Sequence, residues 1–524
     1  MKKDFIEFPS ERAHRYIGAN AWEGQVFRTH FDRWCSDFDQ RVALCTLSQT
    51  ITYGELKAMV RTVASHCLTR GHTPQERIVV QMRNDIPSLA VFFGVMYAGC
   101  IPALSLGSHQ HRELEHIAKA SGATTCFLPD EPDFDQLKHS LTSGTASLEV
   151  IAHSNLLLPP PSKIPLPDAA TGVSPTAPML LLLSGGTTGL PKLIPRTHND
   201  YFYNCRLTIG RCKLTCDDVY LAALPIAHNF PLNNPGILGT LATGGQVVLA
   251  SSPSPDEAFA LIERYGVTFT SLVPSLASLW GEAIQWYSPD LSSLRLVQVG
   301  GAPFPPAHYD RAASAFGCWI QQVFGMAEGL ICLTGENDPA DLARTYQGTP
   351  ISHLDEIRIV DVEGDEVPAG AEGELLVRGP YTINGYFANP QVNAKSFTDD
   401  GFFRSGDLAT FNPQGQLRIT GRIKNVINRG GEKISGEEVE ELVEQIPHIK
   451  AAAAMGIPDS LLGERICVFV VCDGGAPTLA RMRAYLKGCS VPDYKLPDQM
   501  MEVAALPTTA IGKVDLKKLK ALVS

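Results

Sequence analysis

The chain has 524 residues, enough for at least two domains, and its 44% hydrophobic and 19% charged residues are typical of a globular protein. Its formal charge is −11 and it contains no run of Lys or Arg, which argues against a nucleic-acid-binding face. Residues 1–15 are polar and charged and lack the apolar core of an export signal. The most apolar stretch, residues 91–106, is shorter than the roughly 20 residues of a bilayer crossing. We therefore expect a cytoplasmic protein that does not bind membranes.

Strand and helix patterns alternate along the first part of the chain. Residues 42–53 predict a hairpin, and residues 77–82 predict a buried strand followed by a helix over 86–97. Further apolar strands are predicted, in chain order, at residues 179–183, 219–224, 246–249, 268–273 and 294–299. This alternation indicates an α/β fold with mostly parallel sheets.

The pattern changes twice toward the C-terminus. Residues 356–377 predict short strands joined by turns, which indicates a small β-barrel-like subdomain. Later, an amphipathic helix over 436–445 precedes two strands, an α+β pattern. We expect a large N-terminal domain of αβ layers, residues 1–423, and a small C-terminal domain of ordinary size, residues 424–524.

A run of glycine and hydroxyl residues directly follows the strand at 179–183. Glycine lets backbone N–H groups approach an anion closely, and hydroxyl and ammonium groups add further donors. A triphosphate requires such a cradle, although the spacing is neither that of the Walker loop nor that of a dinucleotide-binding loop. Taken alone, a plain flexible turn is an alternative. The residues concerned are Ser184, Gly185, Gly186, Thr187, Thr188, Gly189 and Lys192.

This loop resembles the signature of the acyl-adenylate-forming (ANL) superfamily, which includes acyl-CoA synthetases, luciferases and peptide-synthetase adenylation domains. Other segments resemble further motifs of the family, in the family's order. They are Gly300-Gly301-Ala302, Gln322 to Glu328, Tyr386-Phe387, Ser405-Gly406-Asp407, Gly421 to Lys424 and Pro507 to Lys513. The resemblance implies that the enzyme uses ATP and Mg²⁺ to convert a carboxylic acid to an acyl-AMP.

The resemblance also implies roles for the charged residues of the reaction. Glu328 is expected to bind Mg²⁺, which prefers carboxylate and phosphate oxygens. The family has Thr before this glutamate, whereas this chain has Ala327, so one phosphate-binding hydroxyl is missing and Thr187 or Thr188 is expected to replace it. Lys513 is expected to bridge the substrate carboxylate and the α-phosphate during transfer.

A larger group of residues is expected to bind the nucleotide. Phe324 is expected to offer its face to adenine, Asp407 to accept both ribose hydroxyls, and Arg422 to reach the ribose or a phosphate. With the loop residues named above, the expected ATP site also includes Gly301, Ala302 and Gly325.

By the same resemblance the C-terminal domain is mobile. It would rotate at the hinge Lys424 after adenylation and withdraw Lys513 from the site. Gly430 and Gly431 would then approach the incoming thiol.

The segment from Pro225 to Leu232 is similar to the aryl-acid branch of the family, the stand-alone 2,3-dihydroxybenzoate and salicylate ligases of siderophore assembly. Amino-acid-activating relatives have an aspartate that pairs with the substrate ammonium, where this chain has Asn229. An amide leaves an ammonium unpaired but can hydrogen-bond an ortho-hydroxyl. Phe230 would form an aromatic wall, Gly300 is also expected at the acid, and His228 would gate the thiol tunnel.

Two positions bear on the identity of the acid. Ile331 stands where dihydroxybenzoate enzymes have valine, which favours the smaller salicylate. Asn234 stands where the family has serine or cysteine, and its amide suits a 3-hydroxyl or a ring heteroatom. Discrimination by size involves only about 1–3 kcal/mol. Salicylate, 2,3-dihydroxybenzoate and a heteroaryl acid such as 3-hydroxypicolinate therefore all stay open.

No carrier domain follows Lys513 before the chain ends at Ser524. We expect the acceptor to be the phosphopantetheine arm of a separate aryl-carrier protein in nonribosomal peptide biosynthesis. An aryl-CoA ligase that uses free coenzyme A is a second interpretation. A catalytically inactive nucleotide-binding regulator is a third, which the combined presence of Lys192, Glu328, Asp407 and Lys513 disfavours.

Overall fold

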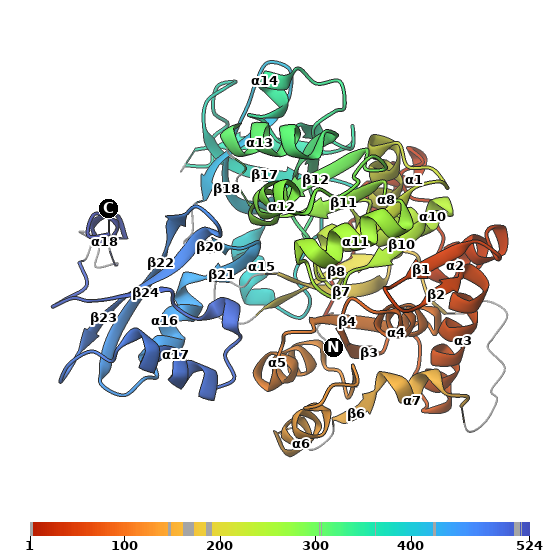
Figure 1. Cartoon of the computed structure of the whole chain (residues 1–524), viewed down its shortest axis with the longest axis horizontal. Helices are drawn as coiled ribbons and strands as arrows, with labels where there is room; N and C mark the ends of the chain where they lie inside the picture. Colours follow the sequence, from red (N-terminus) through yellow and green to blue (C-terminus); the bar gives the residue numbers. More distant parts are fainter. Residues whose placement is uncertain are drawn as a thin grey trace.

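The computed structural model describes residues 4–144, 148–160, 172–184, 191–302, 304, 306–361, 363–422, 426–507, 514 and 516–523. Two large sheets and a small antiparallel sheet form the N-terminal part, and a further sheet forms a separate body at the other end of the molecule (Figure 1). We call the described residues from Val426 onward the C-terminal lobe. The predicted α/β class with a small α+β lobe is thereby confirmed.

The first large sheet has six strands in the order β6-β5-β3-β4-β7-β8, and neighbouring strands are parallel except for β7 and β8. The strands are β3 (Arg77–Met82), β4 (Ile101–Leu106), β5 (Thr125–Leu128), β6 (Glu149–Ala152), β7 (Pro178–Ser184) and β8 (Lys192–Thr197). The helices that accompany it are α3 (Tyr53–Thr69), α4 (Ile86–Tyr97), α5 (His111–Ser121), α6 (Phe134–Gly144) and α7 (His153–Leu157). The predicted strand 77–82 and helix 86–97 are confirmed; Asp85 caps the helix by accepting a hydrogen bond from the Ser88 N–H.

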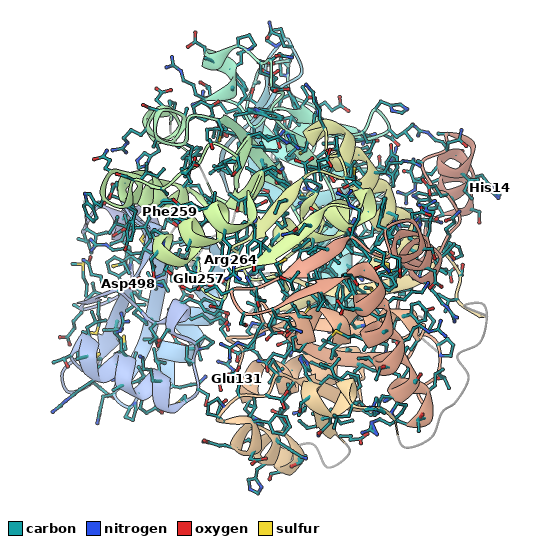
Figure 2. The ribbon with its side chains drawn as sticks, turned by 45° about the vertical axis from the view of Figure 1, so that its right-hand side comes forward. His14, Glu131, Glu257, Phe259, Arg264 and Asp498 are labelled. Atoms are coloured by element: carbon teal, nitrogen blue, oxygen red, sulfur yellow. The ribbon has the colours of Figure 1, made fainter. Side chains whose placement is uncertain are left out.

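The second large sheet has nine strands in the order β15-β14-β13-β12-β11-β9-β10-β1-β2, with a parallel centre and antiparallel strands at both edges. Its strands are β1 (Val42–Cys45), β2 (Thr50–Thr52), β9 (Val219–Ala222), β10 (Gln246–Leu249), β11 (Phe269–Leu272), β12 (Leu296–Gly300), β13 (Trp319–Gly325), β14 (Ile331–Leu333) and β15 (Thr349–Pro350). Helices α11 (Pro255–Tyr265), α12 (Pro274–Tyr287) and α13 (Pro306–Phe316) cover one face. There Phe259, labelled in Figure 2, packs edge-on against Trp280.

The remaining helices of the N-terminal part join these layers. They are α1 (Ser10–Gly18), α2 (Phe27–Asp37), α8 (His198–Cys212), α9 (Asn229–Asn233), α10 (Gly236–Thr243), α14 (Ala340–Ala343) and α15 (Pro390–Ser396). One hydrophobic cluster includes residues of both large sheets and of α2, α4 and α8, so the two sheets share a core. Helix α8 starts where it does because Thr197 and Asp200 form a capping box.

The small antiparallel sheet is larger than the sequence predicted. It contains β16 (Glu356–Val360), β17 (Gly373–Arg378), β18 (Phe403–Phe411) and β19 (Leu417–Arg422), so it continues well past residue 377. The difference arises because a loop and α15 separate β17 from its partner β18, and pairing across such an insertion has no local sequence signal.

The C-terminal lobe is built on β20 (Val426–Arg429), β21 (Glu432–Ser435), β22 (Ile449–Asp459), β23 (Gly463–Cys472) and β24 (Gln499–Glu502). Helices α16 (Gly436–Glu444) and α17 (Leu479–Gly488) and the short η1 (Asp493–Lys495) pack on one side. Helix α18 (Leu516–Lys520) packs on the other, at the outer end of the molecule (Figure 1). Residues 423–425 lie outside the described part, so the boundary at residue 424 stays a prediction.

No helix among the described ranges is both long and apolar enough to cross a membrane.

Candidate active site

A cavity of about 420 Å³ opens at the carboxyl ends of the parallel strands and is closed on one side by the C-terminal lobe. Residues at or just after the carboxyl ends of β4, β9, β12 and β13 line it, which is where α/β sheets place their ligands. The antiparallel sheet adds residues 403–407. The lobe adds residues 430–433 and parts of α16 and η1.

Two of the residues expected to bind phosphate lie on the cavity wall. Ser184 ends β7 and Lys192 begins β8, and the two are paired across the antiparallel ladder, so both reach the cavity wall together. The Ser184 hydroxyl is buried and makes no hydrogen bond to the described residues. The Lys192 ammonium lies 4.5 Å from the ring centroid of Tyr386. The glycines and threonines between them, 185–189, lie outside the described residues.

Glu328 lines the same cavity and is held by two hydrogen bonds. The Tyr386 hydroxyl donates a hydrogen bond to its Oε1 at 2.8 Å, and the Ile383 N–H donates to its main-chain carbonyl at 2.8 Å. Arg196, which is fully buried, donates to the adjacent Ala327 carbonyl at 2.8 Å and is paired with Asp200 at 2.9 Å. The carboxylate is therefore presented to the cavity on a braced turn.

The donor set near Glu328 suits magnesium better than zinc. No group of three or more His, Cys, Asp or Glu side chains is placed to hold a metal within the described ranges. A single carboxylate fits Mg²⁺, which usually takes one or two protein carboxylates together with phosphate oxygens and water.

The residues expected around adenine and ribose are only partly at the cavity surface. Asp407 lines it, is 3% exposed, and pairs through the main chain with Arg422, whose side chain is not described. Gly301 lines it with φ +88°, a conformation that favours glycine. Gly300 pairs with Val323 on the neighbouring strand, and a Cβ atom at position 300 would lie 2.6 Å from the Val323 carbonyl oxygen.

Phe324 and Ala302 lie at the same strand ends but are not part of the lining that the described residues form.

His228, Asn229 and Phe230 also line the cavity, from the start of α9. The Tyr201 hydroxyl donates a hydrogen bond to Asn229 Oδ1 at 2.8 Å.

Asn234 and Ile331 are buried next to Gly325, which lines the cavity, and their expected contact with the acid stays a prediction. A Cβ at Gly325 would lie 3.4 Å from Ile331 Cγ1 and 3.9 Å from Asn234 Nδ2. The Asn234 Oδ1 atom has no hydrogen-bond partner among the described residues.

The C-terminal lobe closes the cavity with the turn between β20 and β21. Gly430 and Gly431 form this turn with φ +59° and +93°, and a Cβ at Gly431 would lie 2.5 Å from Val273 Cγ1. Asp498, labelled in Figure 2, accepts two 2.8 Å hydrogen bonds from Arg429 and so fixes the strand that leads into the turn. The close approach to Val273 explains why glycine is needed here.

The lobe also forms a polar contact with His228 on the cavity wall. Glu432 Oε1 lies 3.5 Å from His228 Nε2. Burial opposes the charged form of His228, but Glu432 overrides it and raises the pKa of the imidazole. Nearby His109 stays neutral, because burial and Lys495 lower its pKa to about 3.

A buried charge cluster joins the lobe to α5. The Lys495 ammonium lies 2.8 Å from Glu438 of its own lobe and 3.7 Å from Glu113 of α5. The three side chains are 8%, 6% and 2% exposed, respectively. Burial raises the pKa of Glu438, against the opposing effect of Lys495.

Several predicted site residues thus come together: Ser184, Lys192, His228, Asn229, Phe230, Gly301, Gly325, Glu328 and Asp407 all line one cavity. Lys424 and Lys513 lie outside the described residues. Sequence reasoning missed Tyr201, Glu432 and Lys495. Of these three residues, only Glu432 has a position in the sequence that indicates a place in the site, since it directly follows the glycine pair expected near the thiol.

Comparison with known proteins identifies both parts of the chain. The family of AMP-binding enzymes matches residues 31–387, and the AMP-binding enzyme C-terminal domain matches residues 438–513. The chain is similar to the salicyl-AMP ligase / salicyl-S-ArCP synthetase of Mycobacterium tuberculosis, at 41% identity over 98% of this chain and 93% of the relative. It is also similar to the 2-hydroxy-7-methoxy-5-methyl-1-naphthoate–CoA ligase of Streptomyces carzinostaticus, at 40% identity over 99% and 96%.

Among solved structures, the apo structure of MbtA from Mycobacterium smegmatis superimposes with a TM-score of 0.76. It is 41% identical and covers 99% of this chain and 98% of its own.

Proposed function

Because this chain belongs to the AMP-binding enzymes and is an adenylate-forming ligase that uses ATP, we propose that its substrate is a 2-hydroxy aryl acid. The acid, of the salicylate or 2,3-dihydroxybenzoate type, is activated as aryl-AMP with release of pyrophosphate. The aryl group then passes to the phosphopantetheine thiol of a separate aryl-carrier protein, in siderophore or nonribosomal peptide biosynthesis.

The observation that carries this proposal is that Asn229 lines the same cavity as Glu328 and Lys192. An amino-acid substrate brings an ammonium, which needs a carboxylate partner. An amide offers none, but it can bind a phenolic oxygen. Phe230 beside it provides an apolar wall that suits an aromatic ring.

The first half-reaction joins two anions, so its main requirement is charge neutralisation and alignment. An oxygen of the aryl carboxylate attacks the α-phosphorus of ATP, and the bond to pyrophosphate breaks. Lys192, Ser184 and the loop 185–189 would bind the phosphates, and Asp407 and Arg422 would hold the ribose. Glu328 would bind Mg²⁺, which would neutralise phosphate charge. Lys513 would stabilise the negative charge that develops on the transferred group.

The second half-reaction requires a thiol to reach the aryl-AMP carbonyl. The turn of Gly430 and Gly431 lies at the cavity with Glu432 next to His228, which supports a thiol path along this side. In the same arrangement α18, close to Lys513 in sequence, packs on the outer face of the lobe. Rotation about Lys424 would exchange the two arrangements.

A coenzyme A ligase is the second candidate. It is favoured by the 40% identity to the naphthoate–CoA ligase, whose name also describes a 2-hydroxy aryl acid. The two candidates share the first half-reaction and differ only in the acceptor.

Acid-dependent exchange of labelled pyrophosphate into ATP tests the proposal. Salicylate, 2,3-dihydroxybenzoate, 3-hydroxypicolinate, benzoate and amino acids should be compared, and we expect the highest kcat/KM with one of the first three. A preference for an amino acid would refute the proposal. Thioester formation with coenzyme A and with an aryl-carrier protein then identifies the acceptor.

A further inference from the structure

One tyrosine of α8 ties down the short helix that carries the acid-binding residues. The Tyr201 hydroxyl donates to Asn229 Oδ1 at 2.8 Å, and the Tyr201 main-chain carbonyl accepts from Asn233 Nδ2 at 2.9 Å. Asn229 and Asn233 are the first and last residues of α9. A single buried residue therefore contacts both ends of the helix that begins with Asn229.

The hydrogen bond from Tyr201 decides which side of the Asn229 amide faces the cavity. Tyr201 is fully buried, and among the described residues its hydroxyl has no other hydrogen-bond partner. The phenol proton needs an acceptor, and only the amide oxygen can accept it. The oxygen is thereby occupied, and the Nδ2 group, which makes no hydrogen bond within the described part of the chain, is left for the ligand.

The tyrosine is itself held in place. Its ring lies 5.0 Å from the guanidinium of buried Arg196, which is bonded to Asp200 and to the Ala327 carbonyl. Burial raises the pKa of the Tyr201 phenol, so it stays protonated and remains a donor. The same buried arginine thus braces both the Glu328 turn and the residue that orients Asn229.

We propose that Tyr201 is a positioning residue that points the Asn229 NH₂ group into the cavity, so that the site selects aryl acids carrying a hydrogen-bond acceptor next to the carboxylate. This inference rests on the proposed function and deepens it. A phenolic oxygen, ring nitrogen or carbonyl oxygen at that position meets a donor. An ammonium or aryl amine, which offers only N–H groups, meets another donor and is rejected.

Salicylate and 2-aminobenzoate form the natural pair of probes. They have similar size and differ at the ortho group. In salicylate the hydroxyl proton can bond the neighbouring carboxylate while the oxygen accepts from Asn229. In 2-aminobenzoate the amine has N–H groups on the side of Asn229 and its lone pair is a poor acceptor.

Tyr201→Phe keeps the ring and removes the hydroxyl, so the amide becomes free to turn. We expect the ratio of kcat/KM for salicylate over 2-aminobenzoate, measured by pyrophosphate exchange, to fall about threefold to tenfold, the equivalent of one hydrogen bond. The KM for ATP should stay unchanged. The matched control is Tyr203→Phe, which removes a buried hydroxyl of the same helix that is bonded to Ser352 at 2.8 Å. It should leave the ratio unchanged.

A second variant keeps the test decisive if Tyr201→Phe unfolds. Asn229→Asp preserves an acceptor for Tyr201 and presents a carboxylate oxygen to the ligand, so the preference should shift toward 2-aminobenzoate. Equal losses with both acids in Tyr201→Phe, or an unchanged ratio in Asn229→Asp, would overturn the inference. Failure of the wild-type protein to use any aryl acid would instead refute the proposed function.

Discussion

Replacing Lys495 by methionine should loosen the C-terminal lobe. The substitution keeps the length of the side chain and removes the cation between Glu113 and Glu438, which are 2% and 6% exposed. At 2.8 Å and 3.7 Å, with an effective dielectric of about 20, the gross attractions are about 6 and 4.5 kcal/mol, most of which offsets desolvation. Loss of one partner of a buried pair typically costs about 3–5 kcal/mol because the other charge stays buried.

Hydrogen exchange measured by mass spectrometry is the suitable assay, because a chain with several sheets need not unfold in one step. Peptides spanning residues 432–444 report on α16, which carries Glu438. A loss of about 3–5 kcal/mol corresponds to amide exchange in Lys495→Met that is roughly a hundredfold to a few thousandfold faster than in the wild type, since about 1.4 kcal/mol equals a factor of ten.

The control is Lys487→Met in the same lobe. Lys487 is 54% exposed and lies 2.8 Å from Asp493, and an exposed pair of this kind contributes about 0–1 kcal/mol. If Lys495→Met exchanges at the wild-type rate, or no faster than Lys487→Met, then the cluster does not stabilise the lobe.

Two further predictions concern the cavity. Tyr386→Phe keeps the ring beside Lys192 but removes the hydrogen bond to Glu328. In steady-state kinetics the KM for magnesium–ATP should therefore rise about tenfold, while the KM for the acid changes little. Equal effects on the two KM values would contradict this prediction. The ion pair between His228 and Glu432 requires a protonated imidazole, and the pKa of His228 is raised. His228 is therefore protonated below the ordinary histidine pKa of about 6.5, and the ion pair is lost as the pH rises through the raised pKa. Glu432→Gln should therefore move the alkaline loss of thioester formation to lower pH, and an unchanged pH profile would show that the pair plays no part in that step.

The strands were the most predictable part of the fold, because short apolar runs such as residues 77–82 and 179–183 are typical of buried strands, whereas the longer apolar run over 86–97 indicates a helix. The residues that line the cavity from strand ends were predictable for the same reason, since parallel strands bring their carboxyl ends to one edge.

Contacts between distant segments were not predictable. Tyr201 reads as an ordinary core residue of a helix, and its hydroxyl acquires a role only because α9 packs beside α8. Lys495 reads as a surface lysine until α5 covers it. Asn234 and Ile331 are brought together beside Gly325 from separate segments of the chain, a proximity that has no local sequence signal. Whether such a side chain is exposed or buried depends on how distant segments pack together, which the local sequence does not indicate.

The bare backbone at Gly431 has a mechanical consequence. Non-bonded carbon atoms have their optimal separation at about 3.5–4.0 Å. A Cβ atom at position 431 would lie 2.5 Å from Val273 Cγ1, so an alanine there would displace the lobe from Val273 by roughly an ångström. The absence of a side chain at this one position therefore decides how closely the lobe approaches Val273 on the cavity wall.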